Sequence, residues 1–409
     1  MKRFKPFAGY TYYNRYEKSN NFSKYVCPYN FENLTEEKIN SLKKNENNVY
    51  LFAEDLNGKA NFKTLLDENV FVAEKSEVFY VYEMSYKINN TPYKITGVVG
   101  VLKLPEKGED YLKICEEVDE KDVLKNIDFL KNCEFFSSPI CAIYEEKEEE
   151  KIYNLIENLK TSSCFLKAKY EKVIHKIWKV KEEEKINILI DFFKDKEYYV
   201  VGGTEKCEAI LKSEDFFDGK KPKYVAAFLF SSFSNRFVGL PVHRLVSELY
   251  MFDSKAILEK SLKYFEISHC KNLDVMRNLM FNFRRQNRVC FGFYADDCFN
   301  VLTLKSSNEV EKMLEDGDIS KNLDVFVLNE ILLKNVLNIK SSDVKYSHND
   351  LEAVFCVDSA NACFAIFLNA IRSSEFFKIV KENKKLPKKS FCFFPRPVEG
   401  LFFQLISEK

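Results

Sequence analysis

Residues 200–206 read Val-Val-Gly-Gly-Thr-Glu-Lys, an apolar strand end followed by a glycine pair and the start of a helix. A turn of this kind points backbone N–H groups at one place, where a phosphate or another anion can bind. The candidate phosphate-binding residues are Gly202, Gly203, Thr204 and Lys206. Two considerations oppose this interpretation. A glycine pair usually marks only a tight turn, and Glu205 repels an anion at a helix N-terminus.

Further residues with suitable chemistry lie elsewhere in the chain. Histidine titrates near neutral pH, so His243 can exchange a proton, and its neighbour Arg244 can hold two phosphate oxygens at once. Cations hold a polyphosphate and carboxylates bind Mg²⁺. The remaining candidates of these two kinds are Lys388, Lys389, Arg396 and Glu116. The alternatives stay open, because His243 can simply cap a strand end and the cations are ordinary surface residues in most proteins.

Residues 202–209 resemble the box Asp-Gly-His-His-Arg-x-x-Ala of a bacterial family long catalogued only as a domain of unknown function. The characterised members of that family are pyrophosphate-dependent kinases of free L-serine. Further blocks are similar to the family in the same order, although Asn30 stands where the family usually has Asp. These blocks are residues 5–7 with 28–30, residues 115–118, residues 239–246 and residues 386–401.

The resemblance implies a serine-kinase-like fold and, at an intact site, Mg²⁺ with pyrophosphate or ATP. This chain departs from the family at the box itself. Gly202 stands for the Asp and Lys206 for the Arg, while Thr204 and Glu205 stand for the two His. Losing two to four charged contacts, each worth about 1.5–3 kcal/mol, removes about 4–8 kcal/mol of transition-state stabilisation. We therefore predict a catalytically degenerate, kinase-like binding or regulatory factor without a cofactor. The alternative is an active free-serine kinase.

Residues 276–288 interleave arginines with phenylalanines, a pattern that can hold phosphates and stack on RNA bases. The candidate RNA-binding residues are Arg277, Arg284, Arg285 and Arg288. Basic runs that could extend such a face lie at Lys220, Lys221, Lys223, Lys384 and Lys385. The alternative is an ordinary basic helix end on the surface.

The composition limits the partners. The chain has 62 basic and 62 acidic residues, so any contact with nucleic acid must be local, and we expect no DNA partner. Twelve cysteines without a Cys-x-x-Cys pair and only four histidines argue against a metal site or a disulfide framework. No signal peptide opens the chain and no apolar run approaches about 18 residues. We therefore expect a cytoplasmic protein without a membrane partner.

The size and the Lys-, Asn- and Phe-rich composition resemble those of microsporidian ribosome dormancy factors. That resemblance implies a partner, the ribosome, with contacts to rRNA and to ribosomal proteins. It also implies a role in translation regulation.

The spacing of apolar residues predicts a mixed α/β fold of closely packed lobes. Residues 78–86 and 93–102 predict a hairpin that turns at Asn89 and Asn90. Helices are predicted at residues 120–132, 186–193, 208–212, 245–251 and 329–336. Further strands are predicted at residues 139–144, 172–178, 198–201, 224–230, 288–294, 299–304 and 400–405. We predict an N-terminal lobe at residues 1–160 and a C-terminal lobe, with the phosphate box, at residues 161–409.

Overall fold

The computed structural model describes residues 2–13, 22–29, 34, 36–53, 58–88, 90–133, 135–146, 148–212, 222–232, 238–249, 251–314, 321–339 and 344–405. Four residues named above lie outside these ranges: Asn30, Asn89, Lys220 and Lys221. Their suggested roles therefore stay predictions.

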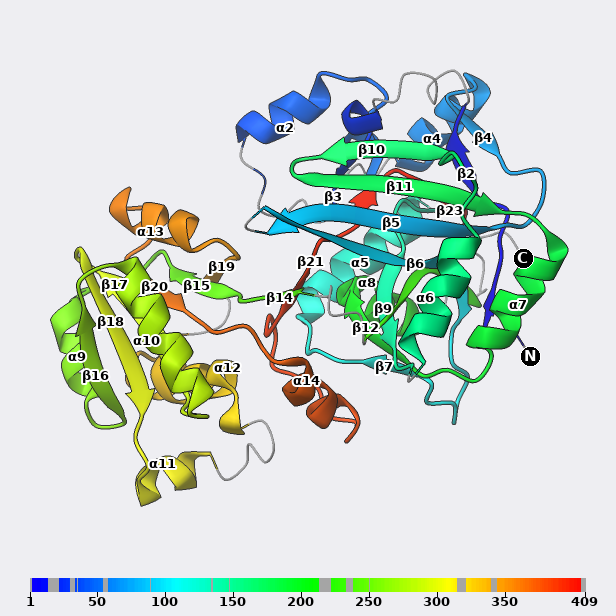
Figure 1. Ribbon diagram of the computed structural model, residues 1–409. Coiled ribbons are helices and arrows are strands. Elements are labelled where there is room, and N and C mark those ends of the chain that lie inside the picture. Colours follow the sequence, from blue (N-terminus) through cyan, green and yellow to red (C-terminus); the bar gives the residue numbers. More distant parts are fainter. Residues whose placement is uncertain are drawn as a thin grey trace. The chain divides into compact units, whose positions relative to one another are not determined.

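The chain forms two compact units, coloured by sequence in Figure 1. Unit 1 comprises Met1–Val238 and Phe393–Lys409, and unit 2 comprises Gly239–Cys392. This division differs from the predicted boundary at residue 160. The reason is strand pairing, because strands formed by residues 166–231 complete the same sheet as the central hairpin. The chain passes between the units at β14 (Val238–Leu240) and β21 (Cys392–Phe394).

Unit 1 is built around a mixed sheet. Its pairs are antiparallel except β12 with β7 and β13 with β9, and β1 (Phe4–Lys5) also pairs with β6. The order across the sheet is β10 (Leu166–Tyr170), β11 (Val173–Val180), β5 (Phe79–Ile88), β6 (Thr91–Lys103), β13 (Tyr224–Ser231), β9 (Ile140–Tyr144), β12 (Tyr198–Gly202) and β7 (Leu112–Ile114). The predicted mixed α/β fold is confirmed.

Helices cover the sheet of unit 1 and share its apolar core. Side chains of α5, α6, α7 and α8 belong to one buried cluster with the strands. The helical segments are η1 (Phe22–Lys24), α2 (Glu36–Lys43), α3 (Tyr50–Ala53), α4 (Gly58–Asp67), α5 (Glu120–Cys133), α6 (Glu149–Asn158), α7 (Glu183–Phe193) and α8 (Thr204–Lys212). Short strand pairs are β2 (Tyr10–Tyr12) with β4 (Phe71–Ala73), β3 (Cys27–Pro28) with β22 (Val398–Glu399), and β8 (Phe135–Phe136) with β23 (Gln404–Leu405). The last two pairs attach the C-terminal segment to unit 1.

Unit 2 contains an antiparallel sheet with helices on its faces. The strand order is β16 (Phe265–Cys270), β18 (Cys298–Leu304), β17 (Cys290–Ala295), β20 (Phe364–Phe367), β15 (His243–Val246) and β19 (Val344–Ser347). The helices are α9 (Ser254–Ser261), α10 (Leu273–Arg285), α11 (Asn308–Met313), α12 (Asp324–Val327), the π-helical segment Leu328–Val336, α13 (Asp350–Asp358) and α14 (Ser373–Val380). Buried Met276 and Met280 of α10 and Ala353 of α13 pack into one core cluster, which places both helices on the same face of the sheet.

Most predicted elements are confirmed, but one is wrong. The predicted hairpin is β5 and β6, which pair from Tyr80 with Val99 to Ile88 with Thr91. The predicted helix at residues 245–251 is not a helix in the described part of that range, because Leu245 and Val246 belong to β15. There β15 lies between β19 and β20, and pairing on both sides overrides the local apolar spacing. The predicted strand at residues 400–405 narrows to β23.

Candidate functional site

The turn between β12 and α8 has the predicted strand-glycine-helix form. Gly203 adopts φ +71°, a left-handed conformation that glycine takes without steric cost. Thr204 begins α8 and is buried, and the Cys207 N–H donates to the Gly203 carbonyl at 2.9 Å. The first turn of α8 carries Glu205, whose charge disfavours an anion at this helix end.

Side chains of the protein itself surround this turn. A Cβ atom added at Gly203 would collide with the Tyr29 hydroxyl, which donates to the Pro139 carbonyl at 3.1 Å. The Lys206 ammonium donates to the Ser138 hydroxyl at 3.0 Å and to the Ser138 carbonyl at 3.4 Å. The Lys206 ammonium also lies 5.8 Å from the centre of the Tyr29 ring. The one cation of the box is therefore held by groups of the chain.

A buried carboxylate lies beside Lys206 and its partners. Glu399 is 4% exposed and accepts hydrogen bonds from the hydroxyls of Ser137 and Ser138. Burial raises the pKa of the Tyr29 phenol well above its ordinary value, and the charge of Glu399 raises it further, although the charge of Arg396 opposes this. Tyr29 is therefore a hydrogen-bond donor at neutral pH. Sequence reasoning gave no role to Tyr29, Ser138 or Glu399, although the family-like block at residues 28–30 includes the first of them.

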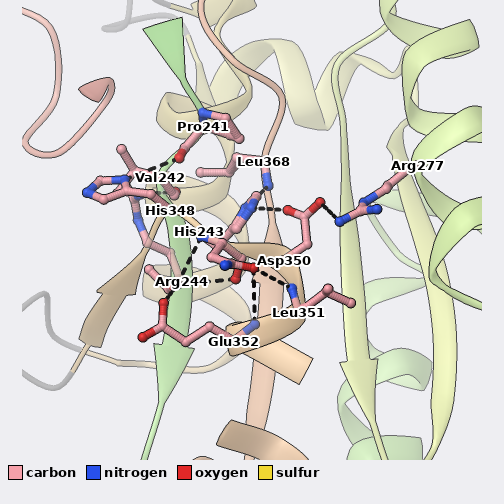
Figure 2. Close-up of polar contacts among 12 residues, drawn as sticks. Pro241, Val242, His243, Arg244, Arg277, His348, Asp350, Leu351, Glu352 and Leu368 are labelled. Carbon is pink, nitrogen blue, oxygen red and sulfur yellow. Dashed lines mark hydrogen bonds and ion pairs between the residues drawn. The ribbon is translucent and has the colours of Figure 1, made fainter. Parts of the chain in front are cut away.

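His243 lies on β15 in unit 2 and is 1% exposed. The Leu368 N–H donates to His243 Nδ1 at 3.2 Å, and Nε2 faces the Asp350 carboxylate. Figure 2 shows His243 between these two groups, with Arg277 on the other oxygen of Asp350. Because Nδ1 accepts from the backbone, the ring proton belongs on Nε2, where it points to Asp350. Both ring nitrogens are thus engaged, and His243 braces β15 against α13.

Asp350 is the partner that sequence reasoning missed. Burial alone would raise its pKa, but the hydrogen bond with His243 and the charge of Arg277 outweigh burial and hold the pKa of Asp350 below its ordinary value. Asp350 stands 107 positions after His243 in the chain, and it begins α13 rather than a recognisable motif. Pairing of β15 with β19, which directly precedes α13, brings the two together.

Arg244 also lies on β15 and is 1% exposed. Its guanidinium donates to the Val242 carbonyl and, at 3.4 Å, to the Lys388 carbonyl. The guanidinium carbon lies 5.0 Å from the centre of the Tyr346 ring. Arg244 therefore ties β15 to the segment around Lys388.

The other sequence candidates divide between the two units. Unit 1 holds the turn residues with Glu116 and Arg396, and Glu116 is 8% exposed just after β7. Unit 2 holds His243 and Arg244 with Lys388 and Lys389, and the Lys388 ammonium lies 5.9 Å from the centre of the Tyr346 ring.

The arginines of α10 and the loop that follows it have acidic or aromatic partners. Arg284 is paired with Glu375 and lies 3.8 Å from Asp324. Arg288 lies 2.7 Å from Glu266. Of the other two arginines, Arg277 is paired with Asp350, and Arg285 lies over the ring of Phe281 at 6.0 Å from its centre. The suggested RNA contact stays a prediction.

Within the described residues, no group of three or more His, Cys, Asp or Glu side chains is placed to hold a metal ion. Also within those residues, no helix combines the length and the apolar character that crossing a membrane requires.

Known proteins give one family match and several distant structural likenesses. No curated protein matches the chain. A conserved hypothetical protein from Pyrococcus furiosus is similar at 10% identity, with a TM-score of 0.38, over 72% of this chain and 89% of that chain. A free serine kinase in complex with AMP is similar at 11% identity, with a TM-score of 0.39, over 72% and 86%. SbnI with a C-terminal truncation, from Staphylococcus aureus, is similar at 10% identity, with a TM-score of 0.38, over 74% and 85%.

The family match covers more than half of the chain. Residues 9–326 fit the model of the family described as protein of unknown function (DUF1015). The match includes the turn between β12 and α8 as well as His243 and Arg244, so it confirms the family resemblance drawn from those residues. The chain belongs to the DUF1015 family.

Proposed function

We propose that this protein is a catalytically degenerate, kinase-like member of its family that acts as a binding or regulatory factor. The observation that carries the proposal is the engagement of Lys206. Its ammonium, the one cation left in the box, donates to the hydroxyl and the carbonyl of Ser138. A phosphoryl donor at this turn would have to displace those bonds and also meet the charge of Glu205.

The environment of His243 supports the same conclusion. A general base needs a nitrogen lone pair within hydrogen-bond reach of the substrate hydroxyl. Nδ1 of His243 accepts from the Leu368 backbone, and Nε2 faces Asp350. The neighbouring Arg244 donates to backbone carbonyls. These contacts favour roles in stability for residues that would otherwise be the best catalytic candidates.

Purified protein supplied with Mg²⁺ and either pyrophosphate or ATP is expected not to phosphorylate L-serine at a useful rate. The measurement is phosphoserine formation over time, with a free serine kinase in the same buffer as the positive control. Turnover near one per second, at the low end of ordinary enzymes, would contradict the proposal and establish the alternative, an active kinase.

We further propose the ribosome as the partner. Large apolar side chains on two neighbouring helices of unit 2 support a role in binding a macromolecule. Phe281 of α10 is 59% exposed, and on α13 Leu351 is 66% and Phe355 is 65% exposed. The ion pair between Arg277 and Asp350 joins these two helices.

Sucrose-gradient sedimentation of native lysate tests this partner. We expect the chain to co-migrate with ribosomes at moderate salt, and the double change Phe281→Ser and Phe355→Ser to shift it towards the top of the gradient. Ile188→Ser is the matched control, because Ile188 is 42% exposed in unit 1. Migration of the unmodified chain as a free protein near its own mass would remove the ribosome proposal.

A further inference from the structure

A surface hollow of about 340 Å³ lies in unit 1, and its described lining shares no residue with the turn at Gly203. It is bounded by η1, by α2 with the loop that follows it, and by the turn between β10 and β11; Figure 1 labels α2 and both strands. Its lining residues are Ser23, Lys24, Lys38, Ser41, Leu42, Lys44, Asn45, Asn48, Tyr170 and Glu171. None of them belongs to the sites described above.

Hydrogen bonds fix the walls of this hollow. The amides of Asn45 and Asn48 both donate to the Lys24 carbonyl, at 2.7 and 2.8 Å. Asn48 is 1% exposed and also accepts from the Tyr50 N–H at 2.9 Å. On the opposite side, the Ser23 hydroxyl accepts from the Lys169 N–H at 3.1 Å. The backbone that carries Lys24 is therefore held between two elements, which gives the hollow a preformed shape.

The charge of the lining is positive. Among the described lining residues there are three lysines, Lys24, Lys38 and Lys44, and one carboxylate, Glu171. Lys38 is paired with Glu171, and both side chains remain about half exposed, at 44% and 56%. Two lysines are thus in excess, which matches the charge of a phosphate monoester near neutral pH.

Tyr170 also belongs to the lining of the hollow. Its hydroxyl is buried and has no hydrogen-bond partner among the described residues. Burial, with the nearby charge of Glu171, raises the pKa of Tyr170 above its ordinary value, so the phenol keeps its proton. Because this hydroxyl has almost no exposed surface, it does not supply a donor to a ligand in the hollow.

We propose that this hollow binds a small phosphorylated metabolite, with Lys24, Lys38 and Lys44 around the phosphate. Ligand pockets commonly measure about 300–1,000 Å³, so the hollow has room for a phosphate monoester with its organic part. Two lining residues, Leu42 and Tyr170, offer the organic part of the ligand an apolar contact. Leu42 is buried, so it is fixed within the wall of the hollow. The site shares no residue with the box at residues 202–209 and is independent of it.

Isothermal titration calorimetry at low salt tests the proposal with glycerol 3-phosphate, AMP and inorganic phosphate as probes. We expect saturable binding of at least one monoester, and at least tenfold weaker binding after the double change Lys24→Gln and Lys44→Gln. Glu171→Gln should instead tighten binding severalfold, because it removes a negative charge from the lining. Binding of inorganic phosphate alone, with neither monoester, would overturn the assignment to a metabolite.

The matched control is Lys43→Gln with Lys63→Gln, which removes two exposed unit 1 lysines outside the lining and should leave the affinity within twofold. If the control double variant and the Lys24→Gln, Lys44→Gln double variant bind the ligand with equal affinity, the proposed site is wrong. Lys206→Gln separates the hollow from the box: if that change abolishes binding while the Lys24 and Lys44 pair does not, the ligand belongs to the box and the proposal is wrong. Absence of binding by every probe at millimolar concentration would overturn it as well.

Discussion

Arg244→Ala is expected to lower the free energy of unfolding by about 2–4 kcal/mol with no ligand present. The guanidinium is 1% exposed and donates to the carbonyls of Val242 and Lys388. Its removal leaves these two carbonyls without that donor and opens a cavity against the Tyr346 ring. Urea unfolding followed by circular dichroism measures the change.

Arg285→Ala is the matched control for that experiment, because Arg285 is exposed on α10 in the same unit. We expect it to change the free energy of unfolding by less than about 1 kcal/mol. If Arg244→Ala lowers the free energy of unfolding as little as Arg285→Ala does, the structural role of Arg244 is contradicted. Pyrophosphate could instead raise the melting temperature of the unmodified protein, and Arg244→Ala could abolish that rise without destabilising the ligand-free protein. Those two results together would show a phosphate site and would revive the kinase alternative.

The second large effect concerns pH and His175, which is 1% exposed on β11. Its Nδ1 lies 2.8 Å from the Tyr82 hydroxyl, and burial lowers the pKa of His175 to about 3. In the unfolded chain a histidine has a pKa near 6.5, so between these values the unfolded state binds the extra proton. Stability therefore falls as the pH decreases from about 6.5 towards 3, by about 2 kcal/mol at pH 5 for this residue alone.

His175→Gln should remove this contribution, so the difference in unfolding free energy between pH 7 and pH 5 should shrink by about 2 kcal/mol relative to the unmodified protein. His348→Gln is the control, because His348 is exposed and its loss should leave the pH dependence nearly unchanged. Urea titrations of the three proteins at both pH values give the six free energies of unfolding. An unchanged pH dependence for His175→Gln would show that the histidine becomes protonated in the folded protein.

Local sequence determined the elements whose residues lie close together in the chain. The alternating, aromatic-rich run before the turn at Asn90 and the run after it predicted β5 and β6, because period-2 patterning and a turn residue suffice for a hairpin. The apolar spacing of residues 120–132 likewise predicted α5. The glycine pair predicted the turn at Gly203, where φ is positive and a side chain has no room.

Tertiary structure decided which secondary structure some residues adopt and which residues become partners. Leu245 and Val246 have helical spacing, yet β19 and β20 on either side make them a strand. The predicted boundary at residue 160 failed to coincide with the unit division for the same reason, since strand pairing joins segments far apart in the chain. The partners of the site residues are equally remote, as with His243 and Asp350 or Arg244 and the Lys388 carbonyl. Sequence spacing shows which residues can do chemistry, but whether a histidine or an arginine is open to a ligand depends on groups that only the folded chain brings within hydrogen-bond distance.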